Sequence, residues 1–222
     1  MEIYRSALGK KYVMALTGIM LMGFVFAHMV GNLKMYMGPV DYDHYAAFLR
    51  KLGYPILPKG VALWLMRAGL LTAVVLHIHS AYSLTRMNQR ARITTYQSKR
   101  DYIAANFASR TMRWTGIIVF LFLIWHLADL TWGWANPDFV EGAVYHNVVV
   151  SFSRVGVAVL YVVANLALGV HLFHGAWSLF QSMGWNSPRF NKWRRNFAAA
   201  FAAIIVVGNC SFPIAVQLGI VG

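Results

Sequence analysis

The stretch KKYVMALTGIMLMGFVFAHMVGNLK, residues 10–34, decides the fold of this chain. Between Lys11 and Lys34 it has no Lys, Arg, Asp or Glu, and it is long enough to cross about 30 Å of hydrocarbon as a helix, which takes roughly 20 residues. It also contains His28, and an ionisable residue inside a span is a functional candidate because the bilayer core penalises it. It lacks the short apolar region and small-residue cleavage site of a signal peptide, so we expect this span to be retained.

Composition indicates a membrane protein throughout the chain. Of 222 residues, 59% are hydrophobic and only 12% are charged, whereas a soluble domain carries about 25% charged residues. The net charge of +13 does not indicate nucleic-acid binding, because Lys and Arg cluster at the ends of apolar runs. The single cysteine, Cys210, excludes an intrachain disulfide and a cysteine-rich cluster site. No internal repeat is visible, so residues 1–222 are interpreted as one domain.

Five apolar segments are long enough to span a bilayer. They lie near residues 12–36, 61–86, 112–134, 150–182 and 196–219. Turn residues such as Gly38-Pro39 and Asn136-Pro137 separate them. Since only closed backbone hydrogen bonding survives in lipid, each segment should be a helix. The expected fold is an all-α membrane protein with five transmembrane helices in a bundle, and the fourth segment is long enough to project beyond the bilayer.

The basic residues predict the orientation, since cytoplasmic loops carry an excess of Lys and Arg. Most of them lie in the N-terminal flank, between the second and third segments, and between the fourth and fifth. The other side has fewer, and it holds the acidic residues Asp41, Asp43, Asp138 and Glu141. We therefore expect a cytoplasmic N-terminus, an outside C-terminus and a multi-pass protein of the cell inner (plasma) membrane. The basic face is also a candidate dock for an acidic partner.

Four histidines lie inside four different segments, at depths that match in pairs. His28 and His126 lie roughly 20 to 25 Å from the basic ends of their helices, at about 1.5 Å per residue. His77 and His174 lie roughly 14 to 15 Å from the basic ends of theirs. The depths predict an outer pair, His28 with His126, and an inner pair, His77 with His174, offset by about 10 Å.

Paired imidazoles from facing helices are typical axial ligands of haem iron. A haem held this way is six-coordinate and suits electron transfer, not oxygen binding. The alternative for a single membrane histidine is a hydrogen bond between helices, but four at paired depths favour ligation. His171 lies one turn from His174 on the same side of its helix, so it competes as a ligand. It could instead bond to a haem propionate or a backbone carbonyl.

Polar residues near the outer pair are candidates for haem contacts. Asn32 and Lys34 closely follow the first histidine and could hold the propionates of the outer haem. Arg67 and Arg154 lie near the same surface and could do so too, or could simply snorkel to the interface.

Asp129 follows the third histidine by three residues, in the stretch HLADLTWG. A buried acid is costly in a membrane, so it either reaches interfacial water or handles protons. It is also a candidate contact for a quinone. On the cytoplasmic side, the candidate contacts for a quinone head group are Ser6, Arg5 and Tyr4.

Four stretches resemble those of one known family. They are HMVGNLKMY (28–36), LHIHSAYSLTRMNQRAR (76–92), WHLADLT (125–131) and GVHLFHGAWSLFQSMGW (169–185). Over nearly the whole chain they resemble the single-chain, five-helix, dihaem cytochrome b subunit of succinate dehydrogenases and fumarate reductases. The resemblance implies four haem ligands: His28, His77, His126 and His174. His171 also has a counterpart in similar sequences, so the choice in the fourth helix stays open.

The resemblance further implies a function carried out with partners. Such a subunit anchors a flavoprotein containing FAD and an iron–sulfur subunit on the cytoplasmic face, and a higher oligomer of this heterotrimer is compatible with it. Electrons from succinate pass through the partners' flavin and clusters to the inner haem b, then to the outer haem b and a quinone, menaquinone or ubiquinone. This chain alone is not expected to oxidise succinate.

Three other functions stay open at this point. A haem b subunit of a hydrogenase or formate dehydrogenase could use the same histidines with other partners. A non-redox transporter or channel could use intramembrane His and Asp as a proton path, although five helices fit poorly with symmetric transporters. The last alternative is a structural anchor that has lost its haem.

Overall fold

The structure, a computed structural model, describes all residues except 1–3, 5, 92–105 and 186. The described residues form helices and turns with no strand among them, which confirms the expected all-α fold. In chain order the elements are α2 (Ala7–Asn32), η1 (Leu33–Met37), α3 (Pro39–Arg50), α4 (Val61–Arg90), α5 (Asn106–Leu130), α6 (Val144–Ser153), α7 (Val155–Ser182), η2 (Pro188–Phe190) and α8 (Asn191–Gln217).

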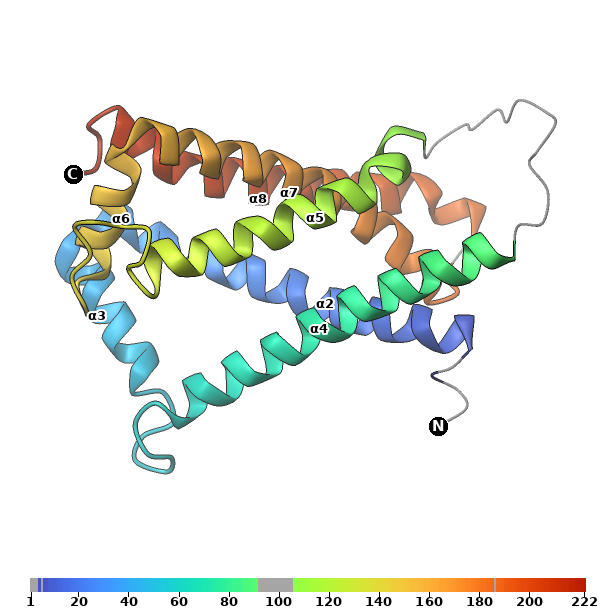
Figure 1. Ribbon diagram of the computed structural model, residues 1–222, viewed down its shortest axis with the longest axis horizontal. Coiled ribbons are helices and arrows are strands. Elements are labelled where there is room, and N and C mark those ends of the chain that lie inside the picture. Colours follow the sequence, from blue (N-terminus) through green and yellow to red (C-terminus); the bar gives the residue numbers. More distant parts are fainter. Residues whose placement is uncertain (1–3, 5, 92–105, 186) are drawn as a thin grey trace.

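Five segments are long and apolar enough to cross a membrane, as the sequence predicts. They are Ala7–Met37, Val61–Arg90, Thr111–Leu130, Val155–Ser182 and Pro188–Gln217. The helices α2, α4, α5, α7 and α8 run alternately in opposite directions (Figure 1). We call the end of the bundle where α2 begins the N-terminal end, and the end where α8 finishes the C-terminal end.

The fourth expected segment, residues 150–182, is not one continuous helix. The backbone becomes extended at Arg154, with φ −78° and ψ 105°, so α6 and α7 are separate helices. They meet at an angle at the C-terminal end (Figure 1). The Arg154 guanidinium is anchored at this break, since it donates to Ala135 O at 2.7 Å and pairs with Asp129 at 2.6 Å. Its partners are distant in sequence, which is why hydropathy does not report the break.

Another helix, α3, lies where the turn residues predicted a loop. Gly38 has φ +98°, a left-handed conformation that glycine tolerates, and Pro39 follows at the first helical position. The helix buries Tyr42 and exposes Val40 and Phe48. It lies at the C-terminal end of the bundle (Figure 1), and it is too short to be one of the five spans.

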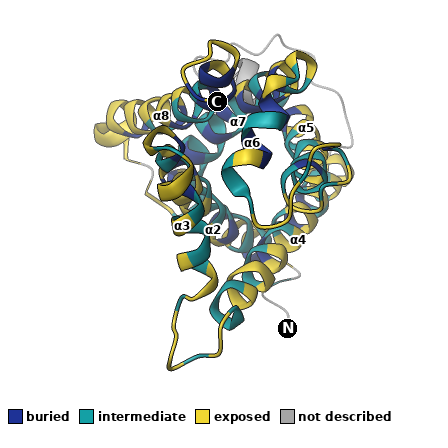
Figure 2. Cartoon of the chain, turned by 90° about the vertical axis from the view of Figure 1, so that its left-hand side faces the viewer, coloured by how far each residue is buried: buried dark blue, intermediate teal, exposed yellow. Residues whose placement is uncertain are grey.

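The four spans that carry the predicted histidine ligands pack as two helical hairpins. Helix α2 lies along α4, and α5 lies along α7, while α8 packs along α7 as well. Buried residues face the interior of the bundle and exposed residues face outward (Figure 2). Exposed apolar side chains such as Leu71, Val163 and Val207 suit an outer surface in lipid, whose tails are as apolar as leucine.

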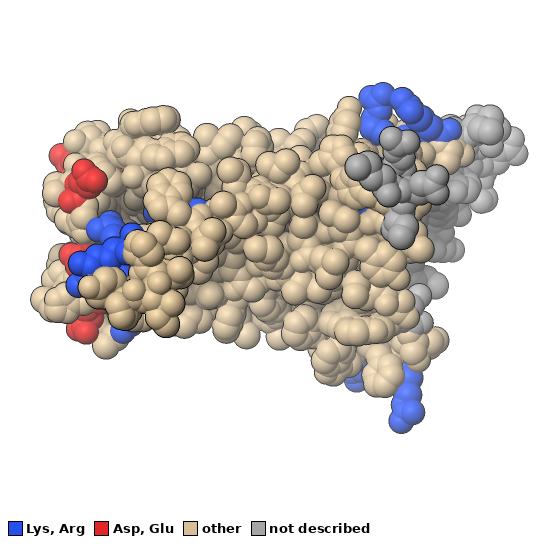
Figure 3. Space-filling view, turned by 90° about the horizontal axis from the view of Figure 1, so that it is seen from below, with Lys and Arg blue, Asp and Glu red and all other residues tan. Residues whose placement is uncertain are grey.

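Charged side chains gather at the two ends of the bundle. Figure 3 shows Lys and Arg at both ends of one face, acidic residues at the C-terminal end, and an uncharged surface between them. An uncharged middle with charged ends is the pattern expected of a chain that crosses a bilayer.

Candidate functional site

The structure brings His28 of α2 beside His126 of α5, as their matched depths predict. Their ring centroids are 5.8 Å apart and the ring planes are perpendicular. A phenylalanine one turn earlier contacts each ring: Phe24 stacks on His28 at 5.4 Å, and Phe122 lies 5.9 Å from His126. We call these two histidines the 28–126 pair; they lie toward the C-terminal end of the bundle.

A second pair forms between α4 and α7, but its member on α7 is not the one preferred from the sequence. His77 faces His171, with ring centroids 6.5 Å apart and an angle of 62° between the planes. His174, the preferred partner, lies one turn further along α7 and is half-buried. The preference relied on Gly175 beside His174, but a Cβ there would only contact Met112, at 3.9 Å. We call His77 and His171 the 77–171 pair.

Threonine hydroxyls fix the orientation of both rings in the 77–171 pair. Thr17 Oγ1 donates to Val13 O at 2.7 Å and lies 3.1 Å from His77 Nδ1. Thr115 Oγ1 lies 3.4 Å from His171 Nδ1 and donates to backbone carbonyls one turn earlier. Since each hydroxyl proton is engaged by the backbone, each oxygen accepts from the imidazole. The proton therefore sits on Nδ1, which leaves the Nε2 lone pair available to a metal.

Glycines next to these threonines let the rings approach the backbone. A Cβ on Gly18 would lie 3.6 Å from His77 Cε1, and a Cβ on Gly116 would lie 3.4 Å from His171 Cε1. A methyl group fits at these distances, but a larger side chain would push the ring out of place.

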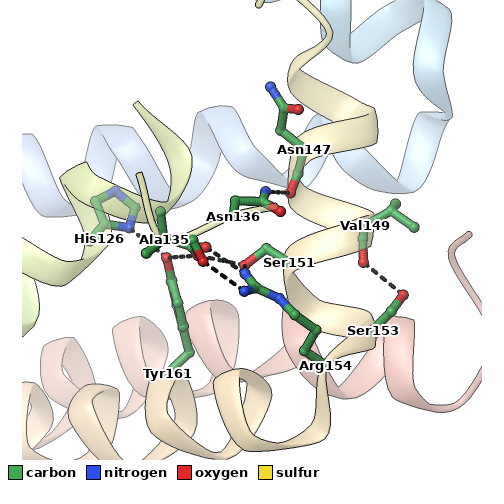
Figure 4. A network of polar contacts seen from close by, with 10 residues as sticks. His126, Ala135, Asn136, Asn147, Val149, Ser151, Ser153, Arg154 and Tyr161 are labelled. Carbon is green, nitrogen blue, oxygen red and sulfur yellow. Dashed lines mark hydrogen bonds and ion pairs between the residues drawn. The ribbon is translucent and has the colours of Figure 1, made fainter. Parts of the chain in front are cut away.

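A buried polar network holds His126 in the other pair (Figure 4). Tyr161 donates its hydroxyl proton to Asp129 Oδ2 at 2.9 Å, and the Tyr161 hydroxyl oxygen lies 3.4 Å from His126 Nδ1. Ser151 donates to the same carboxylate at 2.5 Å and Arg154 pairs with it at 2.6 Å. Asp129 is fully buried. Its carboxylate is therefore paired inside the protein and does not reach interfacial water, which was one of the two expectations for it.

Helices α2 and α5 carry the same sequence pattern, which was missed when no internal repeat was expected. Residues 17–28 and 115–126 both follow Thr-Gly-Ile-x4-Phe-x3-His. In each copy the Thr and Gly contact a histidine of the next span, and the Phe and His build the 28–126 pair. Aligning the first and third spans would have found Thr17 and Thr115. Tyr161 and Ser151 have no such signal, because their contacts depend on the tertiary structure.

Both pairs fit a haem with two axial histidines. Metal–imidazole bonds of about 2.0–2.1 Å on opposite faces of one iron place two ring centroids about 6 Å apart, which matches 5.8 and 6.5 Å. Two imidazoles supply only two ligands, and the macrocycle supplies the other four. Within the described residues, no three His, Cys, Asp or Glu side chains gather as a site for a bare metal ion.

Two buried polar atoms of residues close in sequence to these histidines are also consistent with a bound group. Ser80 Oγ, one turn after His77, and Trp125 Nε1, next to His126, have no hydrogen-bond partner in the described part of the chain. An unpaired buried donor is costly, so each suits a polar substituent such as a propionate.

The other candidate residues have protein partners. Asn32 Oδ1 accepts from the Tyr42 hydroxyl at 2.8 Å; burial raises the pKa of Tyr42 above its ordinary value, so this hydroxyl keeps its proton. Lys34 lies 5.9 Å from the Tyr45 ring, and Ser6 caps α2 by accepting from Gly9 N at 3.0 Å.

Three further expectations concern the surface. The Arg67 guanidinium lies 5.0 Å from the ring of Trp64. Tyr4 forms a hydrogen bond of 2.6 Å with His79 Nδ1. Arg5 lies outside the described residues.

Comparison with known proteins assigns the family. Searches of curated proteins and of solved structures gave no match. The family described as the succinate dehydrogenase/fumarate reductase transmembrane subunit matches residues 85–209, which include α5, α6, α7 and most of α8. The match covers more than half of the chain and includes His126, His171 and His174. On this match, and with five candidate spans, the chain belongs to the family of succinate dehydrogenase/fumarate reductase transmembrane subunits.

Proposed function

We propose that this chain is a dihaem b membrane anchor that passes electrons from an iron–sulfur partner subunit to a membrane quinone. The observation that carries the proposal is the pair of facing imidazole sites, each built from one histidine of each helical hairpin. When bound, haem supplies a one-electron redox centre that is closed to oxygen because both axial positions are filled.

The chain's own residues prepare these sites for iron. Thr17 and Thr115 accept the Nδ1 protons of the 77–171 pair, and Tyr161 accepts that of His126. A hydrogen bond of this kind fixes the tautomer and raises the basicity of the nitrogen that binds the metal. We therefore assign His171, and not His174, as the ligand opposite His77.

The positions of the two pairs define the length of the electron path. Thr17 marks the level of the 77–171 pair on α2, and His28 lies eleven residues further along, about 16 Å at the rise of an α-helix. Thr115 and His126 have the same spacing on α5. This distance is longer than the offset of about 10 Å expected from the helix ends, because it is counted along one helix from the residue that contacts His77 and not from the basic ends of different helices.

The basic N-terminal end is the proposed cytoplasmic face, by the excess of Lys and Arg in its connections. A flavoprotein with FAD and an iron–sulfur subunit would dock there and deliver electrons from succinate to the 77–171 pair first. The electrons would continue to the 28–126 pair and a menaquinone or ubiquinone. The family match favours these partners over those of a hydrogenase or formate dehydrogenase.

A reduced-minus-oxidised visible spectrum of the purified chain, with the haem-to-protein ratio, tests the proposal. We expect a b-type α-band and two haems per chain. His28→Ala and His126→Ala should each remove one and the same haem, while His77→Ala removes the other. His44→Ala, at an exposed position on α3, is the control and should keep both. A chain that contains no haem would exclude the electron-transfer proposal and leave the proton-path alternative.

A further inference from the structure

The two histidine pairs differ in the groups that accept their Nδ1 protons. In the 77–171 pair the acceptors are threonine hydroxyls whose own protons go to backbone carbonyls, so no charged group follows them. His126 instead faces a tyrosine hydroxyl that donates to a carboxylate. Both sites consist of two facing histidines. Among the described residues, only the 28–126 pair has a tyrosine that connects an imidazole to a carboxylate.

We propose that Tyr161 and Asp129 are positioning residues that lower the reduction potential of the haem held by the 28–126 pair. The inference rests on the proposed function, because it concerns a haem at that pair. Tyr161 relays the negative charge of Asp129 to the imidazole of His126, and neither residue touches the iron.

The geometry holds this relay in one arrangement. The Tyr161 ring makes edge contacts with Phe122 at 5.0 Å and with Phe152 at 4.8 Å, which fix its plane. Tyr161 is only 4% exposed and Asp129 is fully buried, so water does not compete for the hydrogen bonds of the hydroxyl or of the carboxylate. The hydroxyl oxygen therefore keeps one donor contact to Asp129 and one acceptor contact to His126.

Arg154 only partly offsets the charge of Asp129 at this position. It pairs with Oδ1, whereas Tyr161 and Ser151 donate to Oδ2. The Arg154 side chain is 31% exposed, so solvent screens part of its positive charge while the carboxylate stays fully buried. The oxygen that faces Tyr161 is not the one that Arg154 contacts, so the guanidinium does not compete with Tyr161 for it.

An acceptor that withdraws the Nδ1 proton makes the other ring nitrogen a stronger electron donor to the metal. Stronger donation stabilises ferric over ferrous iron, and hydrogen bonding around the ligands is one of the means by which proteins set a haem potential. The haem at the 28–126 pair should therefore be harder to reduce than it would be without Tyr161 and Asp129.

The test is a potentiometric titration of both haems in Tyr161→Phe and Asp129→Asn. In Tyr161→Phe we expect one of the two potentials to rise, with the ratio of reduced to oxidised haem changing about tenfold at a given potential, which is about 59 mV for one electron. The second potential should stay in place. Tyr36→Phe is the matched control, since it also removes one tyrosine hydrogen bond, to Ser211 at 2.7 Å; it should move neither potential.

Asp129→Asn should shift the same haem in the same direction. The double variant should shift it by less than the sum of the two single shifts, because the residues act in series. Unmoved potentials, equal movement of both haems, or additive single shifts would overturn the relay. Loss of one haem in both variants would overturn it too, since it would give the two residues a purely structural role. A wild-type chain without haem would refute the proposed function before any variant is compared.

Discussion

Replacing His171 and His174 one at a time discriminates between the two candidate ligands on α7. The His171 ring lies 6.5 Å from His77, near the separation of about 6 Å expected for two imidazoles on one iron. His174 lies about 4.5 Å further along the helix axis and about 60° around it. Its ring cannot occupy the same position without a rotation of α7, which packs along both α5 and α8. His171→Ala should therefore lose one haem of two, and His174→Ala should keep both.

The assay is the haem-to-protein ratio of the purified chain, read with the amplitude of the α-band. His171→Ala should halve both quantities, and combining it with His77→Ala should cause no further loss, because the two residues hold the same haem. His174→Ala serves as the matched control, since it removes the same side chain from the same helix. If His174→Ala halves the haem content and His171→Ala leaves it intact, the assignment based on the ring contact is wrong.

Three other predictions follow from the contacts of the sites. Arg154→Met should lower the free energy of unfolding by about 3 kcal/mol, the low end of the cost of breaking a buried ion pair, because its side chain is 31% exposed. Thermal unfolding in detergent should show a larger loss than in Asp129→Asn, which leaves only the partly exposed Arg154 charge unpaired. Thr115→Val should weaken haem binding about 10- to 100-fold in a titration of haem-free protein, because His171 loses its acceptor. Gly116→Leu should lose one haem by spectrum, because its side chain would displace the ring 3.4 Å from its Cβ position, whereas Gly116→Ala should keep both.

The five spans could be predicted because hydropathy and length depend on composition alone. The local departures could not, because contacts distant in sequence produce them. Arg154 interrupts the fourth segment where it reaches Asp129 at the end of α5 and Ala135 on the connection that follows. Helix α3 is amphipathic and short, and its turn residues Gly38 and Pro39 are equally compatible with a loop. In each case the sequence shows the residue but not the conformation that its surroundings impose on it.

The candidate site shows the same division. The pairing of His28 with His126 could be inferred from depth, since both residues lie far from the basic ends of their helices. The choice between His171 and His174 could not be made from the sequence. The two side chains differ by only about 60° in direction around the helix, and the sequence does not give the rotation of that helix within the bundle. The contacts of His171 with His77, Thr115 and Gly116 discriminate between them.

The repeat in α2 and α5 explains why the sites come in two pairs. Each hairpin contributes one histidine to each pair, so neither hairpin can hold a haem by itself. Helix α4 packs mainly along α2, and His77 is its contact toward α7. A haem between His77 and His171 would therefore join the two hairpins through α4 and α7. In this architecture a bound haem would be both the electron carrier and a structural link, and the Thr-Gly pairs that prepare the ligands also determine how closely the two helices of each hairpin pack.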